Sequence, residues 1–137
     1  MTVSPPEPVP QRPSYVRLYT GSDGETHFED VHLTATIERH GSGAQTAVTP
    51  LVPVEGLIFR RVVDPAISDE PHNAPYPLFI ITLAGAAEVT VSDGETRIFG
   101  AGAVVLAEDT TGKGHTTRDV GEVPRVTLFA PLPPSPR

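Results

Sequence analysis

The sequence contains no cysteine among its 137 residues. This absence excludes disulfide bonds, zinc ribbons, iron–sulfur clusters and thiol-based catalysis. The sequence also lacks any apolar run near the roughly 18 residues that a membrane-spanning helix needs, so membrane insertion is not expected. The first residues form neither a basic segment nor an apolar one. We therefore expect no signal peptide and a cytoplasmic location.

Basic residues are scarce. Lysine and arginine number 10 against 17 aspartates and glutamates, which gives a net charge of −7. Lys113 is the only lysine, and the longest basic cluster is Arg60-Arg61. A surface of this charge repels phosphate backbones, so nucleic-acid binding is not expected. A small molecule or a protein is left as the expected partner.

The length of the chain predicts one domain, because domains cluster at about 100–150 residues. The 16 prolines gather at the two ends, with five in residues 5–13 and four in residues 131–137. Proline fixes φ and removes a hydrogen-bond donor. We therefore predict a proline-rich extended N-terminal tail at 1–13, a folded domain at 14–130 and a proline-rich C-terminal tail at 131–137.

The folded region is predicted to be all-β. Short segments rich in β-branched or apolar residues alternate with clusters of Gly, Pro, Asn and Asp, which is typical of strands and turns. Asp93-Gly94 indicates a hairpin between 87–91 and 96–99. No window of 11 or more residues keeps helical periodicity, and many short strands indicate a sandwich or small barrel. The predicted strands are 14–20, 31–38, 57–63, 79–84, 87–91, 96–99, 104–107 and 125–129.

Two stretches resemble the conserved motifs of the cupin superfamily. The first begins at His72 and ends at Gly85, and its spacing resembles that of the motif His-x-His, a short spacer, Glu, six residues and Gly, with Ala74 and Leu78 in place of the second His and the Glu. The second keeps the glycine spacing of the other motif from Gly94 through Gly102 and ends at Val105. The resemblance covers roughly residues 15–130.

Two further segments sharpen the resemblance. Residues 93–97 (Asp-Gly-Glu-Thr-Arg) and 108–115 (Glu-Asp-Thr-Thr-Gly-Lys-Gly-His) are similar to segments of a subgroup of small bacterial cupins. The resemblance implies a single-domain cupin-type jelly-roll β-barrel. It also implies a homodimer, since cupins commonly pair through the outer face of a sheet, and the outward residues of 79–84 are apolar here.

Cupin chemistry usually rests on a metal ion held by three histidines and a glutamate. The positions implied by the resemblance are His72, Ala74, Leu78 and Val105, of which only His72 has a lone pair to offer. His115 could add a second nitrogen, but catalytic metal sites normally have at least three protein ligands. Glu108 and Asp109 are expected to be solvated loop residues. We therefore expect no metal and no other cofactor.

The replaced ligands turn the implied metal site into an apolar pocket, which suits an apolar small-molecule substrate. In a strand of period two, Leu78, Ile80 and Thr82 share one face. One of Arg60 and Arg61 should also face inward. The candidate substrate-binding residues are Ala74, Leu78, Ile80, Thr82, Val105 and Arg60, and the candidate catalytic residues are His72, His115 and Tyr76.

Several histidines also have a structural interpretation. His27 is expected to have a structural or dimer-contact role, and His32 and His40 are expected on the surface. The sequence leaves open whether His72 and His115 meet. It contains neither a P-loop nor a Gly-x-Ser-x-Gly nucleophile elbow.

Three functions are compatible with these features. The first is a metal-independent cyclase or isomerase of bacterial secondary metabolism, including polyketide-type cyclisation or cycloaddition, in which the cavity folds a flexible substrate. The second is a non-catalytic ligand-binding or regulatory cupin. The third is a metal-dependent cupin oxygenase or epimerase with unusual ligands. The first is the main prediction, because the lost ligands coincide with surviving histidines.

Overall fold

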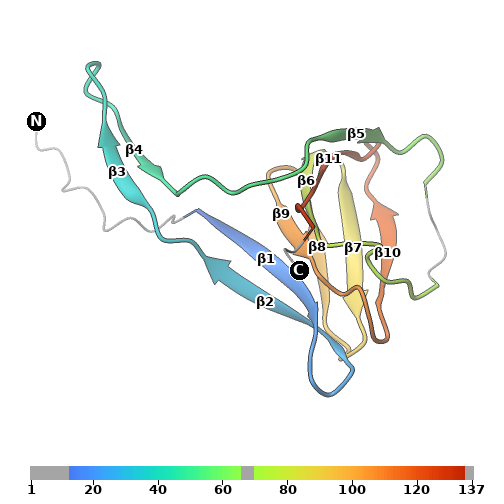
Figure 1. Cartoon of the computed structure of the whole chain (residues 1–137). Helices are drawn as coiled ribbons and strands as arrows, with labels where there is room; N and C mark the ends of the chain where they lie inside the picture. Colours follow the sequence, from blue (N-terminus) through green and yellow to red (C-terminus); the bar gives the residue numbers. More distant parts are fainter. Residues whose placement is uncertain (1–12, 66–69, 135–137) are drawn as a thin grey trace, which may run out of the picture.

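A computed structural model of the chain describes residues 13–65 and 70–134. These residues form eleven β-strands and no helix, which confirms the all-β prediction. Two sheets pack face to face and a separate hairpin projects from them (Figure 1). Within the described part of the chain, no helix is long and apolar enough to cross a membrane. The predicted tail at 1–13 lies outside the described residues except for Pro13, as do 135–137 of the C-terminal tail.

The larger sheet has six strands in the order β2-β1-β9-β6-β11-β5. The β1 and β9 strands run parallel, and the other neighbours are antiparallel. The C-terminal strand continues to Pro131, one residue into the predicted tail. The members of this sheet are β1 (Ser14–Thr20), β2 (Thr26–His32), β5 (Ile58–Arg61), β6 (Leu78–Ala84), β9 (Val104–Ala107) and β11 (Val126–Pro131).

The smaller sheet has three strands in the order β10-β7-β8, all antiparallel. They are β7 (Ala86–Val91), β8 (Thr96–Phe99) and β10 (His115–Val120). The predicted hairpin between β7 and β8 is confirmed, and Gly94 at its turn has φ of 102°, a conformation that favours glycine. The strand β10 was not predicted, because its residues are mostly polar.

The remaining two strands, β3 (Thr36–Arg39) and β4 (Gln45–Val48), form a hairpin that projects away from the packed sheets (Figure 1). The prediction of one strand over 31–38 was therefore wrong. The β2 strand ends at His32, and β3 starts at Thr36 in a different sheet. The strand β4 was not predicted. The exposed side chains of β3 give it no buried face that the sequence pattern could reveal.

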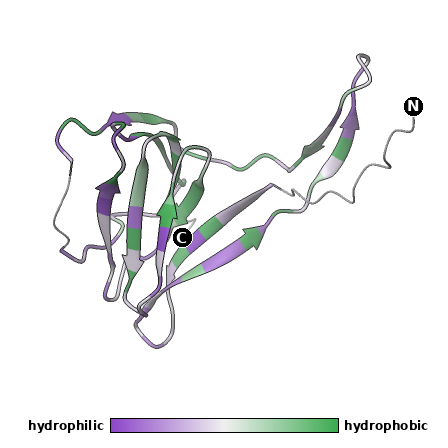
Figure 2. Cartoon of the chain, turned by 180° about the vertical axis from the view of Figure 1, so that it is seen from behind, coloured by the Kyte–Doolittle hydropathy of each residue, from purple (hydrophilic) through white to green (hydrophobic). Residues whose placement is uncertain are grey.

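The core lies between the two sheets. Hydrophobic and hydrophilic residues alternate along several of the strands (Figure 2), as expected for sheets with one buried face. Phe28 of β2 and Phe99 of β8 meet across the layers with ring centroids 5.8 Å apart. The buried cluster contains Leu18, Phe28, Ala74, Leu78, Val91, Phe99, Val105 and Ala107.

The described strands form two open sheets rather than one closed barrel. Neither edge of the larger sheet, β2 or β5, shares a ladder with the smaller sheet. The layers are instead linked by single contacts near Thr26, whose main-chain N–H donates to Ser92 Oγ at 2.6 Å. The hydroxyl of Thr26 also donates to the carbonyl of Gly114 at 2.7 Å. Packing and polar contacts of this kind, which include the ion pair of Arg97 on β8 with Asp30 on β2, therefore hold the sandwich together.

His27 joins the two turns beside this link. Its ring contacts Asp23 at 3.0 Å through Nε2 and Asp93 at 2.8 Å through Nδ1. Hydrogen bonds to Asp23 and then Asp93 raise the pKa of His27, and the same bonds help to lower the pKa of both carboxyls. The expected structural role of His27 thus has a physical basis in the way it ties β2 to the β7–β8 turn.

The raised pKa of His27 predicts a pH dependence of stability. A group whose pKa is higher in the folded state contributes stability below its unfolded pKa of about 6.5 and loses it as the pH rises through the folded value. Between about pH 6 and pH 8 the melting temperature of the wild type should therefore fall relative to that of His27→Gln. His32→Gln, on the same strand, is the control and should follow the wild type. Parallel curves for wild type and His27→Gln would refute this role.

Candidate functional site

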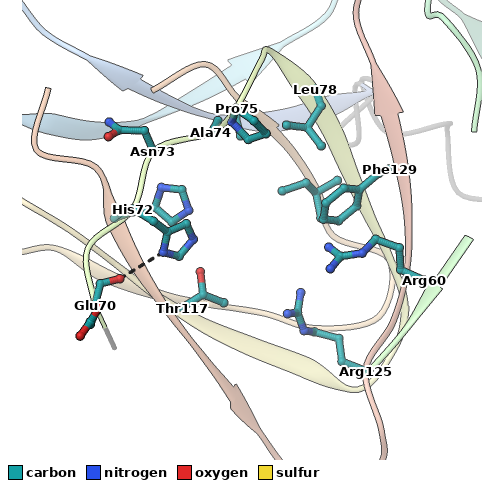
Figure 3. Close-up of a pocket in the computed structure, with 13 residues that line it drawn as sticks. Arg60, Glu70, His72, Asn73, Ala74, Pro75, Leu78, Thr117, Arg125 and Phe129 are labelled. Carbon is teal, nitrogen blue, oxygen red and sulfur yellow. Dashed lines mark hydrogen bonds between the residues drawn. The ribbon is translucent and has the colours of Figure 1, made fainter. Parts of the chain in front are cut away.

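A cavity of about 410 Å³ lies between the two sheets, beside strands β5, β6, β10 and β11 (Figure 3). Its walls combine aliphatic and aromatic side chains with two histidines and two arginines. This composition matches that of small-molecule sites, which are concave and mostly apolar with a few polar groups. The cavity is lined by Arg60, Glu70, His72, Asn73, Ala74, Pro75, Leu78, Ile80, Ala107, His115, Thr117, Arg125 and Phe129.

The structure brings His72 and His115 together, which the sequence left open. The two residues form an isolated antiparallel bridge, in which each main-chain N–H donates to the other residue's carbonyl at 2.9 Å. Their ring centroids are 4.5 Å apart. Gly114 permits this approach: its φ is +74°, and a Cβ there would lie 2.7 Å from the carbonyl carbon of His72.

Asp109 holds the ring of His115. Its Oδ2 lies 2.5 Å from Nδ1 of His115, and the aspartate is completely buried. The expectation that Asp109 is a solvated loop residue was therefore wrong. Its main-chain carbonyl accepts hydrogen bonds from the N–H of Ala74 and from Nδ2 of Asn73, so the same residue also fixes the segment after His72. The buried carboxylate itself has its partner in Nδ1 of His115.

The two hydrogen bonds to Nδ1 decide which ring nitrogens can do chemistry. The main-chain carbonyl of Glu70 accepts from Nδ1 of His72 at 3.1 Å, since a carbonyl can only accept. An ionised Asp109 likewise requires Nδ1 of His115 to donate. In the neutral rings, Nε2 is then the atom with a free lone pair. Among the described residues, Oδ1 of Asp109 is the only fully buried side-chain N or O atom without a hydrogen-bond partner. Nε2 of His115 is therefore not a fully buried atom without a partner.

Glu108, the other carboxylate assigned to a solvated loop, is only partly buried. Its Oε1 accepts a hydrogen bond from Nε of Arg17 at 2.8 Å. That contact to Glu108 is the main cause of the raised pKa of Arg17. Glu108 is not among the cavity residues, so it serves the link between β1 and the loop after β9.

Two arginines face the histidines across the cavity, and Figure 3 shows both guanidinium groups pointing inward. Arg60 lies on the edge strand β5, where its guanidinium carbon is 4.2 Å from the centroid of the Phe129 ring. Arg125 immediately precedes β11, and its Nε donates to Asp119 at 2.6 Å. The sequence could not decide between Arg60 and Arg61, and the structure places Arg60 at the cavity.

Three candidate site residues do not line the cavity. Thr82 is buried and on the same side of β6 as Leu78, but it sits at the far end of that strand, where its main-chain N–H donates to Ala103. Val105 is part of the packed core opposite Ile80. Tyr76 is exposed and borders a separate hollow with Pro77. The structure therefore does not bring these three predicted residues to the wall of this cavity.

The other candidates do reach the cavity: His72, His115, Ala74, Leu78, Ile80 and Arg60. Residues that the sequence did not predict include Arg125, Thr117 and Phe129, together with Asp109 behind His115. Asp109 did have a signal, since it lies in the matched segment 108–115. Arg125 had none, because nothing local distinguishes it from a surface arginine at a strand end.

The residues present do not fit the metal site of a cupin. Three of the four implied positions, Ala74, Leu78 and Val105, have no donor atom in their side chains. No group of three or more His, Cys, Asp or Glu side chains in residues 13–65 and 70–134 is arranged to hold a metal ion. The side chains present offer the imidazoles of His72 and His115 and a carboxylate, Asp109, that is already engaged by His115. This set does not match the ligand arrangement of a metal site.

Comparisons with known proteins add no assignment: no family model matches the chain, and no curated protein matches it as a relative. The resemblance to cupins therefore rests on the sequence motifs alone. What the site can do follows from its own geometry: a buried carboxylate, two adjacent imidazoles, two arginines and an apolar wall.

Proposed function

We propose that the protein is a metal-independent small-molecule enzyme, a cyclase or isomerase, which transfers a proton on a substrate held between the sheets. The observation that carries this proposal is the buried Asp109 bound to Nδ1 of His115 at the wall of a cavity. A carboxylate in that position fixes the tautomer and orientation of the ring. His115 then has the arrangement required of a general base.

The reaction can be divided among the residues of the cavity. Nε2 of His115 accepts a proton from one position of the substrate and then, as the imidazolium, returns it at a second position, with the ring of His72 alongside. The apolar wall, which includes Leu78, Ile80 and Phe129, excludes water and holds a flexible substrate in a compact conformer. Such positioning removes part of the entropic barrier to ring closure.

The runner-up is a non-catalytic ligand-binding or regulatory module. The same cavity supports it, because an apolar wall with two arginines can bind a ligand without any proton transfer. A regulatory gene beside the coding gene would favour this function, whereas a biosynthetic gene cluster would favour the enzyme. The metal-dependent oxygenase or epimerase has less support, because three implied ligand positions carry no donor.

The finer points of fold and setting belong to the same proposal. The motif spacing supports a cupin-type jelly roll for the two packed sheets, and segments 93–97 and 108–115 support a bacterial protein. A cytoplasmic location and a role in secondary metabolism are part of the same proposal. A homodimer is supported by apolar residues left exposed on or beside the edge strand β5: Leu57, Ile58 and Phe59.

A simple proton-transfer substrate tests the proposal. In 5-nitrobenzisoxazole a base removes the proton on carbon, the nitrile forms and the N–O bond breaks to give a coloured phenolate. We expect the wild type to accelerate this elimination. Thr117→Trp, which fills the cavity from β10, should reduce the rate by at least about tenfold, because added bulk takes the place of the substrate.

The neighbouring Thr116→Trp is the matched control, since Thr116 is on the same strand but does not line the cavity. It should retain the wild-type rate. Elimination no faster in the wild type than in buffer, or equal rates in both tryptophan variants, would contradict an enzyme acting in this cavity and leave the binding module as the better account.

A further inference from the structure

The arginine wall of the cavity carries a charge that the proposed proton transfer does not use. Arg60 faces the cavity with its guanidinium over the ring of Phe129, and it makes no ion pair with any carboxylate in the described residues. An arginine directed into a concave site offers five N–H donors in a planar fork, a geometry that matches a carboxylate. Within the part of the chain that the structure describes, this guanidinium is therefore available to a ligand.

Arg125 provides a second donor beside the first. Asp119 accepts from its Nε, and the side chain of Arg125 is only 16% exposed. This ion pair engages the guanidinium at Nε and so fixes its orientation. Both guanidinium groups point into the same space (Figure 3). Two donors held in place converge on one region of the cavity.

The carboxylate on the cavity wall lies away from the arginines. Glu70 is the only carboxylate among the described residues that line it, and Figure 3 shows this residue beside His72, on the opposite side from Arg60. Asp119 is engaged by Arg125, and Asp109 by His115. The cavity is thus divided into a cationic end, an apolar middle and an end that carries the histidines. This contrasts with the net charge of −7 of the whole chain.

We infer that the ligand of this cavity is an apolar small molecule with a carboxylate, which Arg60 and Arg125 bind while the apolar body lies along Leu78, Ile80 and Phe129. The inference rests on the cavity of the proposed function and adds the chemical class of its substrate. Anchoring the carboxylate at the arginine end fixes which atoms of the body reach His72 and His115, so the arginines act as binding residues that set the position of the reaction.

A pair of probes that differ in charge tests the inference. We expect 2-naphthoate to bind the wild-type protein about tenfold more tightly than the neutral 2-naphthamide, because a charge-assisted hydrogen bond to arginine adds affinity that the amide lacks. Arg60→Gln should weaken the binding of naphthoate more than that of naphthamide, and so reduce this preference to what Arg125 alone provides. Isothermal titration calorimetry on the full chain gives both constants without requiring turnover.

Arg61→Gln is the matched control, since Arg61 is the next residue on β5 and does not line the cavity. It should keep the preference for naphthoate. Equal affinity of the wild type for both probes, no naphthoate binding at millimolar concentration, or the same loss in Arg61→Gln and Arg60→Gln would overturn the inference. The neutral 5-nitrobenzisoxazole separates the two proposals: turnover without a preference for naphthoate refutes the carboxylate class alone, whereas the preference without turnover refutes the enzyme alone.

Discussion

Replacing Gly114 with alanine should destabilise the protein by about 2–4 kcal/mol, a large effect for the addition of one methyl group. The residue has φ of +74°, a conformation that L-residues with a side chain rarely adopt. The added Cβ would also lie 2.7 Å from the carbonyl carbon of His72 and closer still to its oxygen. Main-chain atoms cannot rotate away, so the bridge between His72 and His115 would have to open.

Gly24→Ala separates the cost of the positive φ from the cost of the steric clash with His72. Gly24 has nearly the same conformation, with φ of +80°, but a Cβ there would meet nothing within 4 Å. It should therefore lose only the conformational part, about 1 kcal/mol. Chemical denaturation of both variants measures the difference. If Gly114→Ala is no less stable than Gly24→Ala, the close approach of Gly114 to the main chain of His72 is not a feature of the folded protein.

His115→Ala should reduce kcat/KM for 5-nitrobenzisoxazole by about 10²–10⁴-fold, the range that a general base contributes. Asp109→Asn should lower the rate as well, because an amide can turn its NH₂ toward Nδ1 of His115 and so place the proton on Nε2, the atom that must accept. Its shape matches that of aspartate, so the fold should survive. Asp109→Ala should cost stability too, since it leaves Nδ1 of the buried His115 unpaired.

His32→Ala is the matched control for these rates, because His32 is an exposed histidine that does not line the cavity. It should retain the wild-type kcat/KM. Circular dichroism of each variant shows whether a lost rate reflects lost structure. A folded Asp109→Asn protein with the full wild-type rate would show that the orientation of His115 is irrelevant to the chemistry.

Much of the fold could be predicted from local signals. Asp93-Gly94 specified the hairpin because few other pairs adopt the required turn, and β-branched segments specified β1, β6 and β9. The strand β10 could not be found in this way. Its sequence, His-Thr-Thr-Arg-Asp-Val, shows no apolar alternation, because the side chains that face inward there line a polar part of the cavity rather than the core.

The candidate site was harder to predict than the fold. The alternation of side chains along a strand placed Thr82 correctly on the same face as Ile80. This alternation does not show how far along the strand the cavity extends, and Thr82 lies beyond it, near Ala103. Asp109 was misjudged because burial of a carboxylate depends on a partner, here His115, that the chain brings back six residues later. Arg125 reaches the cavity only through the pairing of β11 with β6 and β5.

Chemical rescue of His115→Ala by free imidazole is the most direct test of the central claim, that the ring of His115 is the base that works in this cavity. The rate of 5-nitrobenzisoxazole elimination is measured at increasing imidazole concentration. We predict a saturable recovery of at least about tenfold in His115→Ala and none in the wild type, because imidazole can occupy the space that the lost ring vacates beside Asp109. A His115→Ala protein that is folded and as active as the wild type without imidazole would contradict the account.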